Sequence, residues 1–358
     1  MPTIMDVARL AQVSRSTASR VLNGYTGTPA AVRERVLAAA RALGYEPDAA
    51  ARGLARGRTE NIGVVVADVG DPFFAPFLRG AGEAAAAAGY SLTITSGDWA
   101  REEAAFFRLV RQRRADGLLF ISGRELSPGL AEALRKCELP MVMVDRDEDE
   151  WDLPIDRVDA NNREAMADLV QWLFSQGHER IAFVGGPGDL PAAVRRLEGY
   201  RLGLERSGLT FRPELVIPGD LRLSGGQQAL GVIASQNPRP TAVIAANDLM
   251  AIGILKAASA ARIRVPDDLS VVGVDDIPAA SWVTPELTTL HQPCYEMGRR
   301  GVELLLARIG ERQAKVPAAG DGEREPAGHT GPRHEWIPFR LVVRASVRPV
   351  KDSKTRRP

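Results

Sequence analysis

The chain has 358 residues, of which 45% are hydrophobic and 25% are charged, and its formal net charge at pH 7 is +1. This length exceeds one typical domain, so we expect two or three compact units. The only cysteines, Cys137 and Cys294, are too few for a disulfide framework or a cysteine-rich metal site. No apolar run approaches the roughly 20 residues of a membrane span, and the N-terminus lacks the pattern of a secretory signal, so we expect a cytoplasmic protein without a membrane partner.

Two short helices joined by a tight turn are predicted at the N-terminus. Thr3 and Asp6 have the spacing of a capping box, which places the start of the first helix near Ile4. After the turn AQVS, Ser14 is a candidate cap for a second helix. That helix would direct its apolar side chains to a core and expose a polar set: Arg15, Ser16, Thr17, Ser19, Arg20 and Asn23.

This polar face consists of residue types that contact DNA. Hydroxyls and amides bind phosphate oxygens, and arginine binds guanine through two hydrogen bonds in the major groove. A solvated helix face is the alternative interpretation of two isolated short helices. Residues 1–60 contain nine arginines against five acidic residues, a net charge of +4, which leaves −3 for the remainder. This asymmetry predicts a polyanion as partner of the N-terminal segment alone.

A third helix is predicted from the sequence VRERVLAAARALGY, with Thr28 as its cap and Pro29 at its first position. The segment 46–59 is rich in alanine but contains Gly53 and Gly57, each of which costs roughly 1 kcal/mol in a helix. We therefore expect a helix in this segment to form only when it is docked.

From Asn61 onward, short apolar strands alternate with helices, which predicts an α/β fold with parallel sheets covered by helices. Seven strands are expected in the sequences NIGVVVAD, SLTITS, DGLLFIS, PMVMVD, RIAFVGG, TAVIAAND and LSVVGVDD. They fall into two groups divided near residues 147–154, so we expect two lobes. A surface loop is expected at 310–334 because it is rich in Gly, Pro and charge, and WIPFRLVVRAS is expected to form one last strand.

Polar side chains stand where the predicted strands end. In open α/β sheets, ligands bind outside the carboxyl ends of the strands. Those ends carry Asp68, Asp145, Asn247 and Asp275, which we expect to converge in a cleft between the lobes.

Seven stretches of the sequence, taken together and in this order, resemble the lactose-repressor (LacI/GalR) family of bacterial transcription regulators. They are TIMDVARLAQVSRSTASRVLNG, RERVLAAARALGYEPDAAARGL, IGVVVADVGDPFFAPFLRG, QGHERIAFVGGP, RRLEGYRLGLE, AANDLMAIG and VPDDLSVVGVDDIP with LTTLHQP. The resemblance implies an all-α helix-turn-helix domain at 1–47 and a hinge helix with linker at 48–60. It also implies a two-lobed core like that of periplasmic binding proteins at 61–350, with a disordered tail at 351–358.

The resemblance further implies a homodimer that binds double-stranded operator DNA with a pseudo-palindromic sequence. Arg15, Ser16 and Arg20 match base-reading positions. The positions that match phosphate contacts are Thr3, Ser14, Thr17, Ser19 and Asn23. In the hinge helix, Ala51 would allow close approach and Leu54 would wedge between base steps in the minor groove. Asp48 stands where the family usually has asparagine.

For the core, the resemblance to periplasmic sugar-binding proteins places ten side chains in the cleft: Asp71, Phe73, Phe74, Asp145, Arg146, Asn162, Arg196, Asn247, Asp275 and Gln292. Carboxylates, amides and guanidinium groups can bind adjacent hydroxyls in pairs, and aromatic rings can cover the C–H face of a sugar. The alternative is structural, with the two phenylalanines in the core and an aspartate as a helix cap. Because the set carries a charge of −1 when fully ionised, we expect a neutral monosaccharide as effector.

The sequence thus predicts a transcription regulator whose operator affinity is controlled by a small ligand. The resemblance favours a repressor, although the residues alone are equally compatible with an activator. Two alternatives remain, a sugar-binding protein without a DNA role and an enzyme that uses the cleft carboxylates. The turn GGPGD lacks the lysine of a phosphate loop and the four histidines lack metal-ligand spacing, so no catalytic residue, metal or cofactor is expected.

Overall fold

The computed structural model describes residues 2–25, 27–45, 58–97, 114–121, 126–146, 152–315 and 331–350. They form two compact units, one within Met1–Asn61 and Arg113–Asp116 and the other within Ile62–Gln112 and Gly117–Pro358. The predicted hinge residues Asp48, Ala51 and Leu54 lie outside the described residues, as does the tail 351–358. None of the helices in the described parts of the chain is long and apolar enough to span a membrane.

The described residues of the first unit form three helices, α1 (Ile4–Leu10), α2 (Arg15–Leu22) and α3 (Ala30–Leu43). Both predicted caps of the first two helices are confirmed. The Asp6 carboxylate accepts a hydrogen bond from the Thr3 backbone amide at 2.9 Å, and Ser14 Oγ accepts one from the Thr17 amide at 3.1 Å. The predicted start of the third helix is one residue too early, because Pro29 is extended (ψ 140°) and is itself the cap.

Small side chains allow these three short helices to pack closely. Their buried cluster consists of Val7, Ala8, Ala11, Ala18, Val21, Val36, Ala39 and Ala40. The remaining apolar residues of α1 and α2 that were expected to face a core, among them Ile4 and Leu22, are partly buried against this cluster. The helices therefore bury one side of α2 and leave the other side to the solvent.

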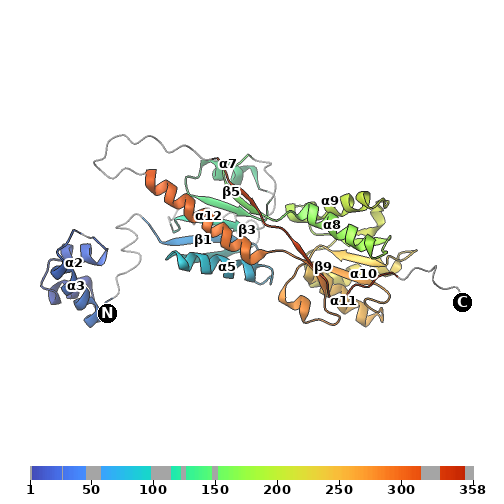
Figure 1. The fold of residues 1–358 in the computed structure, drawn as a ribbon, viewed down its shortest axis with the longest axis horizontal. Helices are drawn as coiled ribbons and strands as arrows, with labels where there is room; N and C mark the ends of the chain where they lie inside the picture. The colour runs from blue at the N-terminus through green and yellow to red at the C-terminus, as the bar shows by residue number, and fades with distance from the viewer. Residues whose placement is uncertain are drawn as a thin grey trace. The chain divides into compact units, whose positions relative to one another are not determined.

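Where the second unit is described, its strands form two six-stranded sheets (Figure 1). The strands of the first sheet, in spatial order, are β11 (His334–Trp336), β5 (Asp156–Asp159), β4 (Met141–Val144), β3 (Gly117–Ile121), β1 (Asn61–Val66) and β2 (Ser91–Ser96). The pairs from β11 to β1 are all parallel. Helices α5 (Phe74–Ala87), α7 (Pro128–Lys136) and α12 (Cys294–Lys315) accompany this sheet, and α5 and α12 pack against each other.

The strands of the second sheet, in spatial order, are β12 (Arg340–Val342), β10 (Thr288–His291), β9 (Ser270–Asp275), β8 (Ala242–Ala245), β6 (Ile181–Val184) and β7 (Val216–Ile217). They are parallel except for β12, which is antiparallel to β10. Figure 1 shows the pair α8 (Asn162–Ser175) and α9 (Pro191–Arg206) on one side of this sheet and the pair α10 (Leu223–Ser235) and α11 (Asp248–Ala260) on the other. Two short turns, η1 (Pro213–Leu215) and η2 (Pro278–Ser281), complete this lobe.

The predicted division between the lobes at 147–154 is wrong. Strand β5 follows this segment and belongs to the first sheet, so the first lobe continues to Asp159. The strand was not predicted because its sequence, DRVD, has only one apolar residue. Its two aspartates are nevertheless buried because they are paired: Asp156 accepts two hydrogen bonds of 2.7 Å from Arg308, and Asp159 contacts His334 at 2.7 Å.

Two predictions near the C-terminus also need correction. Helix α12 continues to Lys315, so the first residues of the predicted loop 310–334 are helical. The single strand predicted from Trp336 onward is instead two strands, β11 and β12, in different sheets. Pro338 lies between them and has no N–H group to donate to a strand ladder.

Three segments connect the two lobes: the step from β5 to α8, the step from β10 to α12, and the step from β11 to β12 (Figure 1). Asn162 lies at the first step and Gln292 at the second. Residues that were predicted to bind an effector therefore stand where the chain passes between the sheets.

Candidate DNA-binding and effector sites

The exposed side of α2 presents two arginines to the solvent. Arg15, Ser16 and Arg20 are exposed, whereas Ala18 and Val21 on the opposite side are buried. Within the described residues, neither arginine has a hydrogen-bond or ion-pair partner. Each guanidinium group therefore keeps its five donors for an external acceptor, and a paired arrangement on a guanine edge is the typical use of such a group.

The predicted phosphate-binding hydroxyls already take part in local hydrogen bonds. Ser14 Oγ lies 2.8 Å from both Ser16 Oγ and Thr17 Oγ1, and Thr3 Oγ1 donates to Asp6 at 2.7 Å. Ser19 Oγ accepts a hydrogen bond from Asn23 at 3.3 Å. Ser19 Oγ accepts from Asn23 and so keeps its proton to donate to a phosphate oxygen. Ser14 Oγ has three polar neighbours, including the Thr17 amide, so it must exchange one local bond to bind a phosphate.

In the core, four of the predicted effector residues lie at the carboxyl ends of strands. Asp145 follows β4, Asp275 ends β9 and Gln292 follows β10, and each of these side chains is buried. Asn247 follows β8 and caps α11, because its Oδ1 accepts a hydrogen bond from the Met250 amide at 3.0 Å. The rule that ligands bind at strand ends thus identified Asp145, Asn247 and Asp275, whereas Gln292 came from the resemblance. The fourth residue that the rule selected, Asp68, is exposed and accepts a hydrogen bond from the Gly70 amide at 2.8 Å.

The Arg196 guanidinium connects Asp275, Gln292 and Asn162 into one buried network. It donates to Asn162 Oδ1 at 2.8 Å, to Gln292 Oε1 at 2.8 Å and to the Ala246 carbonyl, and it lies 3.4 Å from Asp275 Oδ1. Asp145 Oδ1 in turn accepts from Gln292 Nε2 at 2.8 Å and from Asn162 Nδ2 at 3.1 Å. Most of the donors are therefore occupied within the network, and a ligand must replace some of these bonds.

Burial controls the charge of the two carboxyl groups. It raises the pKa of Asp145 to about 7 and raises the pKa of Asp275 well above its ordinary value, although the neighbouring Arg196 acts in the opposite direction. A carboxyl group that keeps its proton near neutral pH can donate as well as accept a hydrogen bond. Such a group suits a ligand hydroxyl, which does both as well.

Residues with unusual backbone conformations gather at the same place. Asp145 (φ 58°), Leu221 (φ 60°), Asp275 (φ 118°) and Asp276 (φ 60°) all have positive φ angles. Leu221 belongs to this region because its carbonyl accepts a hydrogen bond from Asn247 Nδ2 at 2.8 Å. Strained backbone of this kind concentrates at binding sites, where the surrounding structure holds it in place.

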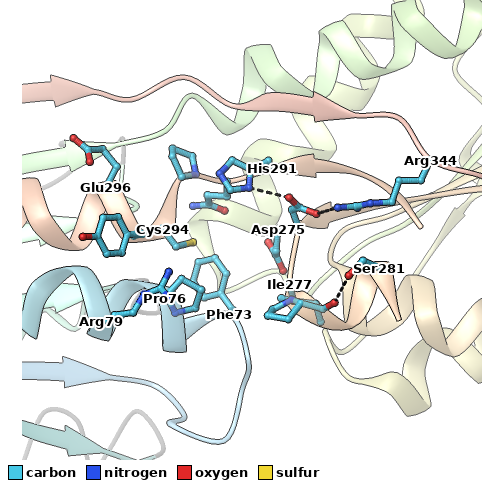
Figure 2. A pocket seen from close by; sticks show the side chains of 15 residues that line it. Phe73, Pro76, Arg79, Asp275, Ile277, Ser281, His291, Cys294, Glu296 and Arg344 are labelled. Carbon is cyan, nitrogen blue, oxygen red and sulfur yellow. Dashed lines mark hydrogen bonds and ion pairs between the residues drawn. The ribbon is translucent and has the colours of Figure 1, made fainter. Parts of the chain in front are cut away.

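A cavity of about 400 Å³ borders the network (Figure 2). Phe73, Asp275 and Gln292 of the predicted set line it, together with His291 and Cys294. Figure 2 shows Phe73 on the side of the first lobe and Asp275 on the side of the second, so both lobes contribute to its wall. The cavity therefore has polar groups at Asp275 and Gln292 and an aromatic ring at Phe73.

Three other predicted residues have local structural contacts. Phe74 is buried in the core of the first lobe, where its ring meets that of Phe73 edge to face at 5.1 Å. Asp71 is half-buried and accepts a hydrogen bond from the Phe73 amide at 2.9 Å, which closes the turn before α5. Arg146 is buried, and its backbone amide donates to Asp159. Phe74 thus has the core position that the structural alternative describes, whereas Asp71 closes a turn and the cap of α5 is Phe73.

Sequence reasoning missed several residues of this region. His291 ends β10 and could have been found by applying the strand-end rule to that strand. Cys294 follows two residues after Gln292 but carries no distinguishing pattern. Asp248 is the first residue of α11. Acidic residues are common at helix N-termini because they interact favourably with the helix dipole, so its position alone indicated no further role.

A helix-turn-helix unit joined to a two-lobed α/β core with a polar cleft defines the class of ligand-controlled DNA-binding regulators. Residues 3–48 match the bacterial regulatory proteins of the lacI family, and residues 170–347 match the periplasmic binding protein-like domain. The ribose operon repressor of Escherichia coli (strain K12) is 38% identical over 314 residues, which are 86% of this chain and 93% of that protein. The chain therefore belongs to the lacI family of bacterial regulatory proteins.

Solved structures agree with this assignment. The lac repressor dimer bound to operator and the anti-inducer ONPF superposes with a TM-score of 0.82 at 27% identity, covering 97% of this chain and 99% of that one. A LacI family regulator from Enterococcus faecium with bound ribose superposes with a TM-score of 0.68 at 25% identity, covering 81% and 100%. The predictions of an α/β fold with a helix-turn-helix domain, and of a transcription regulator rather than an enzyme, are confirmed.

Proposed function

We propose that this protein is a dimeric repressor that binds a pseudo-palindromic operator through α2 and releases or retains it in response to a neutral monosaccharide. One observation carries the proposal most directly. Gln292 lies on a segment that passes between the lobes, and it connects Asp145 of the first lobe to Arg196 of the second by hydrogen bonds of 2.8 Å each. A ligand that replaces these hydrogen bonds therefore changes the contact between the two lobes.

Three residue sets contact the DNA in this proposal. On α2, Arg15, Ser16 and Arg20 read bases. Phosphate contacts, which fix the orientation of this helix on the duplex, are made by Thr3, Ser14, Thr17, Ser19 and Asn23. Ala51 and Leu54, in the hinge segment, contact the minor groove. We propose the domain boundaries 1–47, 48–60, 61–350 and 351–358 for the DNA-binding domain, hinge, core and tail. Because its target is the chromosome, the protein acts in the cytoplasm.

The hydrogen-bonding groups of the cleft support a sugar as effector. Asp275 and Gln292 offer adjacent donors and acceptors to a pair of hydroxyls, and Phe73 offers a ring to the C–H face. Similarity supports the same class, since one relative regulates a ribose operon and one similar structure contains ribose. The raised pKa values of Asp145 and Asp275 reduce the negative charge of the cleft residues. The choice of a neutral sugar therefore rests on the hydrogen-bonding groups of Asp275 and Gln292 and the ring of Phe73, and not on the net charge of −1.

Coupling between the sites follows from differential affinity. A ligand can change operator affinity only if it binds one lobe arrangement more tightly than the other. The effector would exchange hydrogen bonds with Gln292 and Asp275, which belong to different parts of the core, and so favour one arrangement. The operator half-sites then receive the paired α2 helices at a different spacing.

Calorimetry can test the effector class. The protein is titrated with neutral pentoses and hexoses, with their phosphates and with the corresponding sugar acids. Micromolar binding of a neutral sugar, lost in Asp275→Ala, is the expected result. Binding of a phosphate or an acid, with no binding of any neutral sugar, would contradict the proposal.

A further inference from the structure

Asp248 is a buried carboxyl group that lies next to the effector network without lining its cavity. It begins α11 and is 0% exposed. Its Oδ2 accepts a hydrogen bond from the Ile277 amide at 2.9 Å, and its Oδ1 accepts one from Thr289 Oγ1 at 2.6 Å. One side chain thus ties the start of α11 to strand β10 and to the loop that follows β9.

That loop carries Asp275 in a conformation that needs support. Asp275 (φ 118°) and Asp276 (φ 60°) both lie in a region that side chains other than glycine rarely adopt. A free loop would relax out of this conformation, so neighbouring contacts must hold it. The hydrogen bond from the Ile277 amide to Asp248 fixes the backbone directly after the strained pair.

A corresponding arrangement exists in the first lobe. Asp145 also has a positive φ angle, 58°, and the next residue, Arg146, donates its amide to Asp159. Asp159 is 0% exposed, and its second oxygen lies 2.7 Å from His334 Nε2. In each lobe, a buried aspartate outside the cavity therefore holds the backbone just after a strained aspartate at a strand end.

We infer that Asp248 is a positioning residue for effector recognition, which sets the orientation of Asp275; Asp159 has the corresponding place beside Asp145. This inference rests on the proposed function, because it takes the two strand-end aspartates as effector-binding groups. Asp248 acts through the backbone of the loop and touches no effector. Its loss should weaken effector binding without altering the DNA-binding helices.

The test compares two replacements of Asp248 in the full-length protein. Asp248→Ala removes both acceptors and should lower affinity for the sugar identified by calorimetry by about tenfold, the size of one buried hydrogen bond. Asp248→Asn keeps one acceptor for the Ile277 amide and can donate to Thr289 Oγ1, so it should restore most of the affinity. Operator affinity measured without sugar should stay within about twofold of the wild type in both variants, since α2 is unchanged.

Ser346→Ala is the matched control for general damage to this lobe. Ser346 is 0% exposed, accepts a hydrogen bond from the Thr288 amide at 2.8 Å and donates to the Val271 carbonyl at 2.6 Å, so its loss removes two comparable bonds. It supports no strained loop, and it should lower stability while leaving sugar affinity unchanged. Equal losses of sugar affinity in Ser346→Ala and Asp248→Ala, or no loss in Asp248→Ala, would overturn the inference.

Gly273→Ala provides a second route that removes no polar group from the site. A Cβ atom at Gly273 would lie 2.1 Å from Asp248 Oδ1, so the carboxylate must move. As a single substitution, Gly273→Ala should weaken sugar binding. Added to Asp248→Ala, it should cause little further loss of sugar affinity. If Asp248→Ala does not fold, Gly273→Ala replaces it as the test. Additive losses would overturn the inference. A wild-type protein that binds operator but no sugar would instead overturn the proposed function, and the inference with it.

Discussion

Gln292 and Asp145 are joined by a hydrogen bond of 2.8 Å from Nε2 to Oδ1, which links the segment between β10 and α12 to the end of β4. The carbonyl oxygen of the same amide accepts a hydrogen bond from Arg196, also at 2.8 Å. One amide thus donates to a carboxyl group and accepts from a cation, so its orientation is fixed. Buried hydrogen bonds in such a chain polarise one another, and breaking one affects the next.

Replacing Gln292 by leucine should destabilise the core and weaken sugar binding. The change leaves one Arg196 donor and one Asp145 acceptor without their partner in a buried site, which costs about 1–3 kcal/mol of the free energy of unfolding. Urea denaturation followed by circular dichroism measures this loss. Gln228→Leu, at an exposed position of α10, is the matched control and should change stability by less than about 0.5 kcal/mol. Equal effects of the two substitutions would show that the network contributes nothing.

The raised pKa of Asp145 predicts a pH-dependent effect of Asp145→Asn. Folding raises this pKa from its ordinary 3.8 to about 7, so the folded state holds the proton more tightly. The stabilising contribution is complete below the unfolded pKa and is lost as pH rises through about 7. Asparagine cannot ionise, so the variant's stability does not depend on this titration. Between pH 3.8 and about pH 7, the free energy of unfolding of Asp145→Asn should therefore rise relative to that of the wild type, by at most roughly 1.4 kcal/mol per pH unit.

Urea denaturation of the wild type and Asp145→Asn at several pH values between 4 and 8.5 tests this expectation. The difference in the free energy of unfolding should rise up to about pH 7 and then level off. A difference that stays constant over the whole range would show that the Asp145 pKa is not raised by folding.

Periodicity predicted most elements of the fold because their apolar residues face a core. Strand β5 escaped prediction because its buried residues are polar and are stabilised by partners far along the chain, such as Arg308 for Asp156. No local pattern reveals a pairing of this kind. The division between the lobes was misplaced for the same reason, since it depends on the sheet to which β5 belongs.

For the effector site, the strand-end rule selected Asp145, Asn247 and Asp275, together with the exposed Asp68, but could not show how they are used. Asp275 and Asp145 are connected through Arg196 and Gln292, and Arg196 lies on a helix and has no strand-end signal. The positions of Phe73 and Phe74 are adjacent in sequence, yet only Phe73 lines the cavity. Backbone strain at Asp275 is likewise invisible in the sequence, because aspartate at a strand end is ordinary.

Arg15→Ala should change sequence specificity as well as affinity. Loss of a base-reading arginine costs about 1–3 kcal/mol on the cognate operator and relaxes preference at one base pair. Fluorescence anisotropy with the operator, single-base variants and random DNA measures both. Arg33→Ala, an exposed arginine of α3, is the control that removes the same charge and should leave specificity unchanged. Identical losses on operator and random DNA in Arg15→Ala would remove Arg15 from the base-reading set.

Two operator half-sites require a two-fold dimer. Light scattering of the full-length protein at micromolar concentration should give the mass of two chains, that is, twice 38.6 kDa. A monomer that persists at this concentration would contradict the operator proposal, because one α2 helix reads only one half-site.

Sugar-dependent operator binding tests the central claim most directly. A labelled pseudo-palindromic duplex, selected from a randomised pool by the protein itself, is titrated with wild type and with Asp275→Ala, each with and without the sugar identified by calorimetry. The sugar should shift the wild-type operator affinity by about 5- to 150-fold. Asp275→Ala should bind the operator as the wild type does and show no shift. An operator affinity that no sugar changes in the wild type, or a full sugar response in Asp275→Ala, would contradict the coupling of the cleft to the DNA-binding helices.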